Sequence, residues 1–327
     1  MKVNLGIAVD LGTTTVAAML WNLKEQKLIG KASAKNKQSE HGADVVSRQS
    51  FCSRKPGNEI VLKQEAVDTV NGLIGELCRY SERITRAVIA GNTVMTGFFG
   101  DGEGLLVSED AEIVTVPAIG GFIGGDVTAG LIASDVMRGD KLTLFMDIGT
   151  NGELVLADRD TALACSAAAG PAFGRAGLLG SGMIDAVGEM LRSGEIDRTG
   201  RYIDRRNEKI TQKHIRDFQL AKGAVATGVE MLLAKAGREA KDLERIVVAG
   251  VFGSRIDAKN AIETGLINGV DESIIEFAGN AAGDGASEIL IKPELLDTAE
   301  MIADKIKHVE LANEPEFQDM FLKNLNF

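Results

Sequence analysis

Residues 146–153, MDIGTNGE, are nearly a second copy of residues 9–15, VDLGTTT. Each copy starts in an apolar run that ends at Asp, continues through a short Gly-Thr segment, and leads into another apolar run. This pattern predicts a strand, a tight turn and a returning strand. The sequence therefore predicts two hairpins of one design, one in each half of an α/β chain.

Each predicted hairpin combines an acid at a strand end with a turn of glycine, hydroxyl and amide residues. Backbone N–H groups and Thr hydroxyls of such a turn can converge on a phosphate. The Asp carboxylate repels phosphate, so the combination is explained by a cation between them, most simply hydrated Mg²⁺. Two facing hairpins would clamp a polyphosphate from both sides. A purely structural hairpin turn is the alternative interpretation.

Composition limits the classes of protein that fit. The 327 residues are 45% hydrophobic and 25% charged, which is typical of a soluble globular chain with room for two domains. A net charge of -11 without a compensating basic cluster argues against nucleic acid or anionic lipid as the main partner. No apolar run reaches membrane-spanning length, and Asp10 interrupts any signal-peptide pattern. We therefore expect a cytoplasmic protein.

The cysteines and histidines do not form a recognisable site. Cys52, Cys78 and Cys165 are far apart and none belongs to a CxxC pair. A disulfide framework, a cysteine zinc site and an iron-sulfur cluster held within one chain are therefore not expected. The three histidines are equally scattered, so a histidine-based catalytic triad has little support.

In the first half, strands are predicted at 5–9, 16–20 and 84–90, and a long helix at 59–82. The polar segment 36–54 is predicted to be a loop that leads into a short helix. Glycines surround Asp126 just before a predicted helix at 127–137. Asp126 is interpreted either as the N-cap of that helix or as an acid that orients an attacking water, and the two roles are compatible.

In the second half, strands are predicted at 142–147 and 153–158 and a helix at 219–236 with Gly237 as its C-cap. A strand at 246–248 runs into AGVFGSR before another helix. Such a turn can support an adenosine and its phosphates through backbone N–H groups, with Gly250 and Gly253 keeping the approach open. We expect an N-terminal lobe at 1–137 and a C-terminal lobe at 138–327.

Several strings together resemble one superfamily of ATPases, that of actin, the sugar kinases and the seventy-kilodalton chaperones. Within it the chain resembles the C-terminal ATPase domain of the reductive activators of corrinoid proteins. The strings run from residue 6 to the C-terminus: GIAVDLGTTTVAA, HGADVVSR, AGNTVMTG, GGDVTAG, MDIGTNGELVL, ACSAAAGPAF, AGVFGSRIDAKNAIETGLI, GNAAGDGA and ELANEPEFQDMF. The resemblance implies two ribonuclease-H-like lobes with ATP in the cleft between them.

The resemblance also implies roles for particular residues. Asp10 and Asp147 would hold Mg²⁺ through water, and Asp126 would orient the attacking water. The phosphates would be gripped by Gly12, Thr13, Thr14, Gly149, Thr150 and Asn151, and the adenosine bordered by Gly250, Val251, Phe252 and Gly253. The implied partner is a corrinoid (cobalamin-carrying) protein, whose inactive Co(II) form is reduced to Co(I) at the expense of ATP.

One feature of that family is not found in this sequence. The activators usually carry an N-terminal ferredoxin-like domain whose cysteines bind an iron-sulfur cluster, and nothing of the kind precedes Lys2. We expect either that this is the ATPase domain of a longer protein or that it works with a separate iron-sulfur electron carrier.

Three other functions fit the same scaffold. A dehydratase-type activator would share a cluster between two subunits, with Cys165 as a candidate ligand, although one Cys per chain supplies a homodimer with only two of four ligands. A small-molecule kinase would need an acceptor pocket, and no sizeable insertion between the motifs provides one. A nucleotide-gated binding module would close on ATP without turnover. The oligomeric state is left open.

Overall fold

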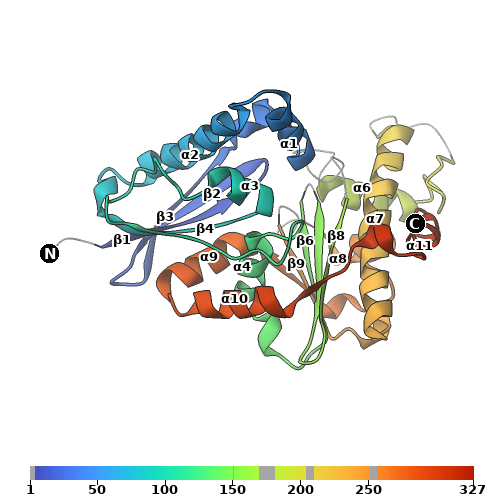
Figure 1. The fold of residues 1–327 in the computed structure, drawn as a ribbon. Coiled ribbons are helices and arrows are strands. Elements are labelled where there is room, and N and C mark those ends of the chain that lie inside the picture. The colour runs from blue at the N-terminus through green and yellow to red at the C-terminus, as the bar shows by residue number, and fades with distance from the viewer. Residues whose placement is uncertain (1–3, 150, 169–180, 204–209, 251–255) are drawn as a thin grey trace. The chain divides into compact units, whose positions relative to one another are not determined.

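The structure is a computed structural model that describes residues 4–149, 151–168, 181–203, 210–250 and 256–327. The chain forms two compact units, each with its own sheet and core (Figure 1). The first unit contains Met1–Ser134 and Ala281–Lys305, and the second contains Asp135–Asn280 and Ile306–Phe327. Among the described residues, no helix combines the length and the apolar character that crossing a membrane requires.

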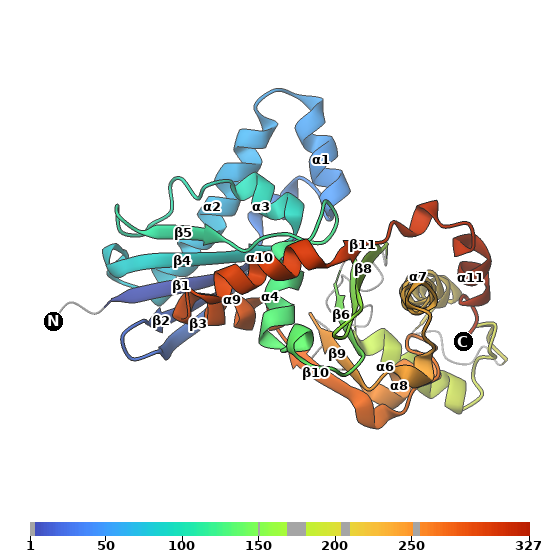
Figure 2. The ribbon, with the colours of Figure 1, turned by 60° about the horizontal axis from the view of Figure 1, so that its bottom comes forward.

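The sheet of the first unit has the strand order β3-β2-β1-β4-β5. The first three strands are antiparallel, and β4 and β5 run parallel to β1. Figure 2 shows β5 at one edge of this sheet, beside β4. The strands are β1 (Leu5–Leu11), β2 (Thr15–Asn22), β3 (Lys27–Lys35), β4 (Ile84–Gly91) and β5 (Glu112–Thr115). This is the ribonuclease-H-like arrangement, and it places the end of β1 beside the end of β4.

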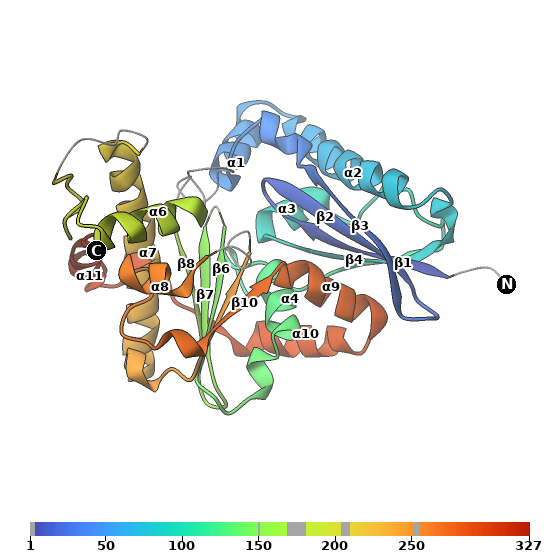
Figure 3. The same cartoon turned by 180° about the vertical axis from the view of Figure 1, so that it is seen from behind.

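Helices cover both faces of the first sheet (Figures 1 and 3). On one face, Ile7, Val9 and Leu11 of β1 pack against the helices that follow β3 and β4. These are α1 (Val45–Arg54), α2 (Asn58–Leu77) and α3 (Thr93–Phe99). On the other face, Ala8 packs with α4 (Gly125–Ala133), α9 (Ala281–Ile291) and α10 (Leu295–Lys305). Because side chains alternate along a strand, Asp10 lies on the same face as Ala8.

The second unit repeats this topology and adds one short strand. Its sheet order is β10-β9-β6-β7-β8-β11, with β6, β7 and β8 antiparallel and β9 and β10 parallel to β6. The strands are β6 (Thr143–Ile148), β7 (Gly152–Ala157), β8 (Ala162–Ala167), β9 (Arg245–Ala249), β10 (Ile275–Gly279) and β11 (Lys307–His308). The two predicted hairpins are thus the corresponding β1–β2 and β6–β7 pairs of the two units.

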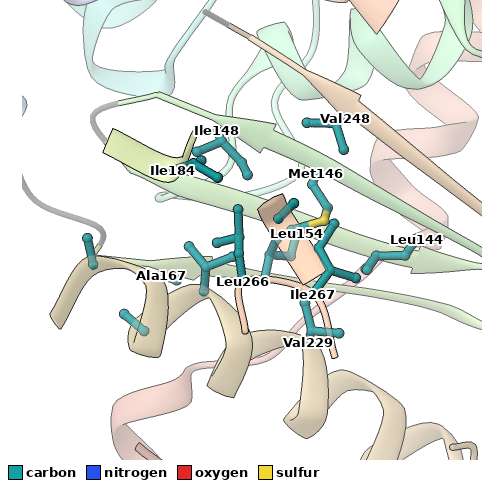
Figure 4. Close-up of a cluster of buried hydrophobic side chains, with 14 of the residues drawn as sticks. Leu144, Met146, Ile148, Leu154, Ala167, Ile184, Val229, Val248, Leu266 and Ile267 are labelled. Atoms are coloured by element: carbon teal, nitrogen blue, oxygen red, sulfur yellow. The ribbon is translucent and has the colours of Figure 1, made fainter. Parts of the chain in front are cut away.

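The core of the second unit lies between one face of its sheet and a layer of helices (Figure 4). Leu144, Met146 and Ile148 of β6 all belong to this core, so Asp147 lies on the opposite face. The helices are α6 (Ser181–Arg192), α7 (Gln212–Ala236), α8 (Ala258–Glu263) and α11 (Phe317–Lys323). Short 3₁₀ helices occur at Lys37–Glu40, Ser81–Arg83, Val136–Arg138, Ala240–Asp242, Glu272–Ile274 and Leu311–Asn313.

The fold class predicted from the sequence is confirmed, and Gly237 ends α7 in the left-handed conformation as expected. The assignment of the whole segment 138–327 to the second lobe differs from the structure, because 281–305 belongs to the first unit. The small and aliphatic residues Ala282, Ala286 and Ile289 of α9 are buried, and the last two share a core with β1 and β4. The return of this segment to the first unit depends on tertiary packing. No change in the local sequence pattern marks it.

Candidate functional site

The tip of the first hairpin is held by its carbonyl groups. The carbonyl of Gly12 accepts a hydrogen bond from Asn36 Nδ2 at 3.0 Å, and that of Thr14 accepts one from the Asn36 backbone N–H at 2.9 Å. Between them, the carbonyl of Thr13 accepts a hydrogen bond from Arg48 Nη2. In a trans peptide the carbonyl and the next N–H point in opposite directions. The N–H groups of Thr13, Thr14 and Thr15 therefore point away from these donors.

The sequence of the tip is suited to a tight turn that presents donors. A Cβ atom on Gly12 would lie 2.4 Å from the carbonyl oxygen of Thr15, so a larger residue would open the turn. The side chains of Thr14 and Thr15 are exposed. Consecutive N–H groups with adjacent hydroxyls can bind an anion. That Gly12, Thr13 and Thr14 bind phosphate stays a prediction.

Asp10 is the penultimate residue of β1 and stands between two alanines in the sheet. Its register partners are Ala17 on β2 and Ala90 on β4. Both register partners are small, so neither places a long side chain beside the part-buried Asp10. Asp10 is therefore placed beside the turn formed by Gly12 and Thr13, at the carboxyl end of a parallel strand pair, where α/β sheets bind ligands.

Asp126 belongs to the same half-site, but its interpretation as an N-cap was wrong. The N-cap of α4 is Gly124, and Asp126 is the second helical residue, whose Oδ1 accepts a hydrogen bond from the Val127 N–H at 2.9 Å. A Cβ atom on Gly124 would lie 2.5 Å from the carbonyl oxygen of Gly91, so the helix start fits closely against the end of β4. Only glycine, which has no Cβ atom, fits at this capping position.

The surroundings of Asp126 change its acidity. Burial raises the pKa of its carboxyl from 3.8 to about 6, against the opposing effect of its hydrogen bond from Val127. Like Asp10, it lies on the α4 side of the first sheet, near the end of β4. A carboxylate of this acidity is still largely ionised at neutral pH and is a better proton acceptor than an ordinary Asp.

The second half-site centres on Asp147 at the end of β6. Its register partners are Glu153 on β7 and Ala249 on β9. Gly250 follows directly, with φ of +83°, and a Cβ atom there would lie 2.4 Å from Asp147 Oδ1. Its N–H donates to the carbonyl of Gly279 at 3.0 Å. Gly250, predicted to border the adenosine, is thus a close neighbour of the Asp147 carboxylate.

The tip of the second hairpin is described only in part. The N–H of Gly149 donates to the carbonyl of Asn151 at 2.8 Å, which closes the turn on itself. The predicted ligand residues Thr150, Val251, Phe252 and Gly253 lie outside the described residues.

Cys165 lies in the core of the second unit. It is fully buried with its Sγ 3.9 Å from the carbonyl oxygen of Gly228 on α7, and burial raises the pKa of its thiol. These surroundings are those of an inert structural thiol and oppose a role as a shared cluster ligand. Within the described ranges, no three His, Cys, Asp or Glu side chains gather as ligands for a metal ion.

Sequence reasoning missed the residues that hold the first hairpin. Asn36, Gln38 and Arg48 are fully buried polar side chains. The segment was predicted to be a loop followed by a short helix, and α1 confirms this. The sequence did offer one signal for this support: the polar residue Asn36 follows directly after β3, beside the turn between β1 and β2. Two acceptors of Arg48, by contrast, are distant in sequence: Thr13 is 35 residues away and Met95 is 47 residues away.

Two units of the same ribonuclease-H-like topology, each with an Asp-ended hairpin, define the fold of the actin-like ATPases. Two family models match the chain: "C-terminal domain of RACo the ASKHA domain" over residues 141–176 and 204–327, and "RACo middle region" over residues 5–103. The chain belongs to this family of reductive activators of corrinoid proteins. The resemblance predicted from the sequence motifs is therefore confirmed.

Individual relatives agree with this assignment. The chain is 28% identical to the corrinoid activation enzyme RamQ of Eubacterium limosum, over 98% of this chain and 70% of RamQ. It is 22% identical to the Co(II) methylated amine-specific corrinoid protein reductase of Methanosarcina barkeri, over 98% of this chain and 77% of the reductase. A solved reductive activator for a corrinoid, iron-sulfur protein superimposes with a TM-score of 0.90 at 27% identity. That match covers 100% of this chain and 66% of the solved chain.

Proposed function

We propose that this chain binds and hydrolyses ATP and thereby drives the reduction of an inactive Co(II) corrinoid protein to its Co(I) form. The observation that carries the proposal is the first hairpin, whose three tip carbonyls are held from behind beside Asp10. This arrangement suits a triphosphate, because the outward N–H groups supply donors and the carboxylate supplies a metal ligand. The names of the relatives support a corrinoid protein as the partner.

The residues of both half-sites fit a magnesium nucleotide. Asp10 and Asp147 would hold Mg²⁺ through water, and the ion would neutralise charge on the phosphates. Gly12, Thr13 and Thr14 would bind phosphate oxygens on one side and Gly149, Thr150 and Asn151 on the other. The segment that begins at Gly250 would border the adenosine. These roles require the two half-sites to face one nucleotide.

In this scheme Asp126 accepts a proton from the attacking water. Water attacks the terminal phosphorus, the bond to the bridging oxygen breaks, and ADP and phosphate leave. The electron that converts Co(II) to Co(I) comes from an iron-sulfur donor, in cis or in trans. ATP use would change the cobalt environment so that this single electron can enter.

The test compares the wild-type protein with Asp10→Ala and Asp147→Ala. Phosphate release and the loss of Co(II) absorbance are measured with a corrinoid protein, a low-potential iron-sulfur donor and MgATP. We expect each variant to lose turnover by about a hundredfold or more, because charge neutralisation at the phosphates is lost. Asp101→Asn, at an exposed ion pair with Lys63 in the first unit, is the matched control and should keep full turnover.

The same assay separates the alternatives. Full activity in Asp10→Ala or Asp147→Ala would refute the assignment. ATP binding without phosphate release, even with the corrinoid protein present, would identify a nucleotide-gated binding module. ADP formation that depends on an added sugar or carboxylate would identify a kinase.

A further inference from the structure

Arg48 is the most deeply enclosed charged side chain of the first unit. It is fully buried, and its guanidinium group donates to acceptors on separate segments. Nε donates to the carbonyl of Gly42 at 3.1 Å, and Nη1 contacts Gln38 Oε1 and Met95 Sδ, both at 3.0 Å. Nη2 donates to the carbonyl of Thr13 at the hairpin tip. One side chain thus connects the tip to α1, to the 3₁₀ helix Lys37–Glu40 and to α3.

Two further buried side chains complete this support. Asn36 holds the carbonyls on either side of Thr13, and its Oδ1 accepts a hydrogen bond from the Gln38 N–H at 3.0 Å. Gln38 in turn donates from Nε2 to the carbonyl of Leu62 on α2 at 2.8 Å. The support of the tip is therefore anchored to a long helix of the core, so that the tip conformation is determined by the body of the unit.

A role in stability alone explains this arrangement poorly. Burial lowers the pKa of Arg48 to about 10, while Asp44 and Glu65 act in the opposite direction, so the group remains a cation at neutral pH. Replacing a buried charge network by apolar residues of similar volume is often neutral or stabilising. The network does, however, fix a geometry that apolar packing cannot fix, because a guanidinium group donates in several set directions.

The charge of Arg48 also acts on the tip directly. A peptide group whose carbonyl accepts from a cation is polarised, and its N–H becomes a stronger donor. The N–H that follows the Thr13 carbonyl belongs to Thr14, one of the residues predicted to bind phosphate. Arg48 therefore both orients this peptide and strengthens its donor without touching the ligand itself.

We propose that Arg48 is a positioning residue for nucleotide binding, which holds the first hairpin tip with its N–H groups aimed at the phosphates of a nucleoside triphosphate. The inference rests on the proposed ATP binding and adds to it a residue outside the ligand shell. It predicts that substitution of Arg48 weakens the binding of MgATP and raises KM, while kcat at saturating nucleotide changes little.

The experiment uses Arg48→Lys, Arg48→Met and the control Arg86→Gln. Lysine keeps the charge but cannot reach Gly42 and Thr13 together, and methionine keeps the volume alone. Arg86 is also a buried arginine of the first unit, paired with Glu112 at 3.4 Å, and its register partner is Gly6 near the start of β1. It is therefore at the opposite end of the strand from the hairpin tip.

Three quantities are measured for each protein: the affinity for MgATP by calorimetry, the unfolding temperature without nucleotide, and hydrogen exchange of the peptide that contains Thr13–Thr15. We expect Arg48→Lys to bind MgATP about tenfold more weakly, equivalent to losing one charge-assisted hydrogen bond. Its tip amides should exchange faster, and its unfolding temperature should fall by a few degrees, because part of the buried hydrogen-bond network is lost. Arg86→Gln should leave both affinity and tip exchange unchanged.

The possible outcomes are distinct. Wild-type affinity and tip exchange in Arg48→Lys would overturn the inference, as would an equal loss of affinity in Arg86→Gln. If Arg48→Met does not fold, Arg48→Lys carries the test. If the wild-type protein does not bind MgATP, the proposed function fails. Hydrogen exchange of the Thr13–Thr15 peptide in Arg48→Lys then decides whether Arg48 holds the hairpin tip. Faster exchange than in the wild type supports this role, and unchanged exchange refutes it.

Discussion

Replacement of Asp126 by asparagine separates the stability of the first unit from its activity. Asparagine has nearly the same shape and still accepts the hydrogen bond from the Val127 N–H, but it carries no charge. In the wild-type protein, burial raises the pKa of this carboxyl from 3.8 to about 6. The folded state therefore bears a penalty for the ionised carboxylate that the unfolded state does not bear.

The size and the pH dependence of the penalty follow from this pKa. A rise from 3.8 to about 6 corresponds to at most about 3 kcal/mol. Because the surface of Asp126 is only partly buried, the expected value is about 1–2 kcal/mol. Because the folded pKa is raised, the penalty is absent below pH 4, develops between pH 4 and pH 6, and is constant above pH 6. Asp126→Asn should therefore be more stable than the wild type at pH 8 and equally stable at pH 4.

The assay is urea unfolding of both proteins at pH 4, 5, 6 and 8, with phosphate release measured at pH 8. We expect the difference in unfolding free energy to increase along this series to about 1–2 kcal/mol while phosphate release falls by about a hundredfold. A difference that is independent of pH would contradict the raised pKa of Asp126. ATP hydrolysis by Asp126→Asn at the wild-type rate would exclude Asp126 as the proton acceptor.

Two further predictions concern the pH profile and Gly250. Phosphate release by the wild type should rise with pH around the Asp126 pKa of about 6 and level off near pH 7, because the ionised carboxylate is the active form. A flat profile from pH 5 to 8 would exclude Asp126 as the base. Gly250→Ala should weaken MgATP binding at least about tenfold, because its Cβ would lie 2.4 Å from Asp147 Oδ1. The control is Gly237→Ala, which is also at positive φ but whose added Cβ would have no atom within 4 Å. It should lose about 1 kcal/mol of stability and no affinity for MgATP. Equal losses of affinity in the two variants would contradict the assignment of Gly250 to the nucleotide site.

The sequence predicted the features of this fold that are encoded locally. The two Asp-x-Gly-Thr segments lie between apolar runs, and each belongs to the expected hairpin. The long helix predicted at 59–82 is α2, although it ends at Leu77 because the backbone of Cys78 is extended. These features depend on residues within a few positions of one another, so periodicity and turn chemistry are sufficient to find them.

The features that escaped prediction depend on contacts between distant segments. The return of 281–305 to the first unit is decided by its packing against β1 and β4. The position of Asp126 in α4 depends on the close fit of Gly124 against Gly91. The burial of Arg48 requires acceptors at Thr13 and Met95 that no local pattern connects to it. In each case the deciding partner is remote in sequence.

Asp10 and Asp147 occupy the same position in their hairpins, but their neighbours in the sheet differ. This difference affects what each half of the chain would contribute to the proposed nucleotide site. In both units the Asp side chain lies on the face of the sheet opposite to the buried residues on either side of it in the strand. Its register partner on the adjacent parallel strand is an alanine, Ala90 or Ala249. On the other side the first Asp faces Ala17 and the second faces Glu153.

This asymmetry extends to the turns. The first turn is fixed through its carbonyls by Asn36 and Arg48, which directs its amides outward. At the second, the Gly149 amide is used within the turn, and the close neighbour of Asp147 is Gly250. In the proposed ATPase the first hairpin would therefore contribute backbone donors held in place from behind together with the Asp10 carboxylate, and the second would contribute the Asp147 carboxylate with Gly250 beside it. Loss of Arg48 should then weaken nucleotide binding, whereas loss of Asp147 should abolish turnover.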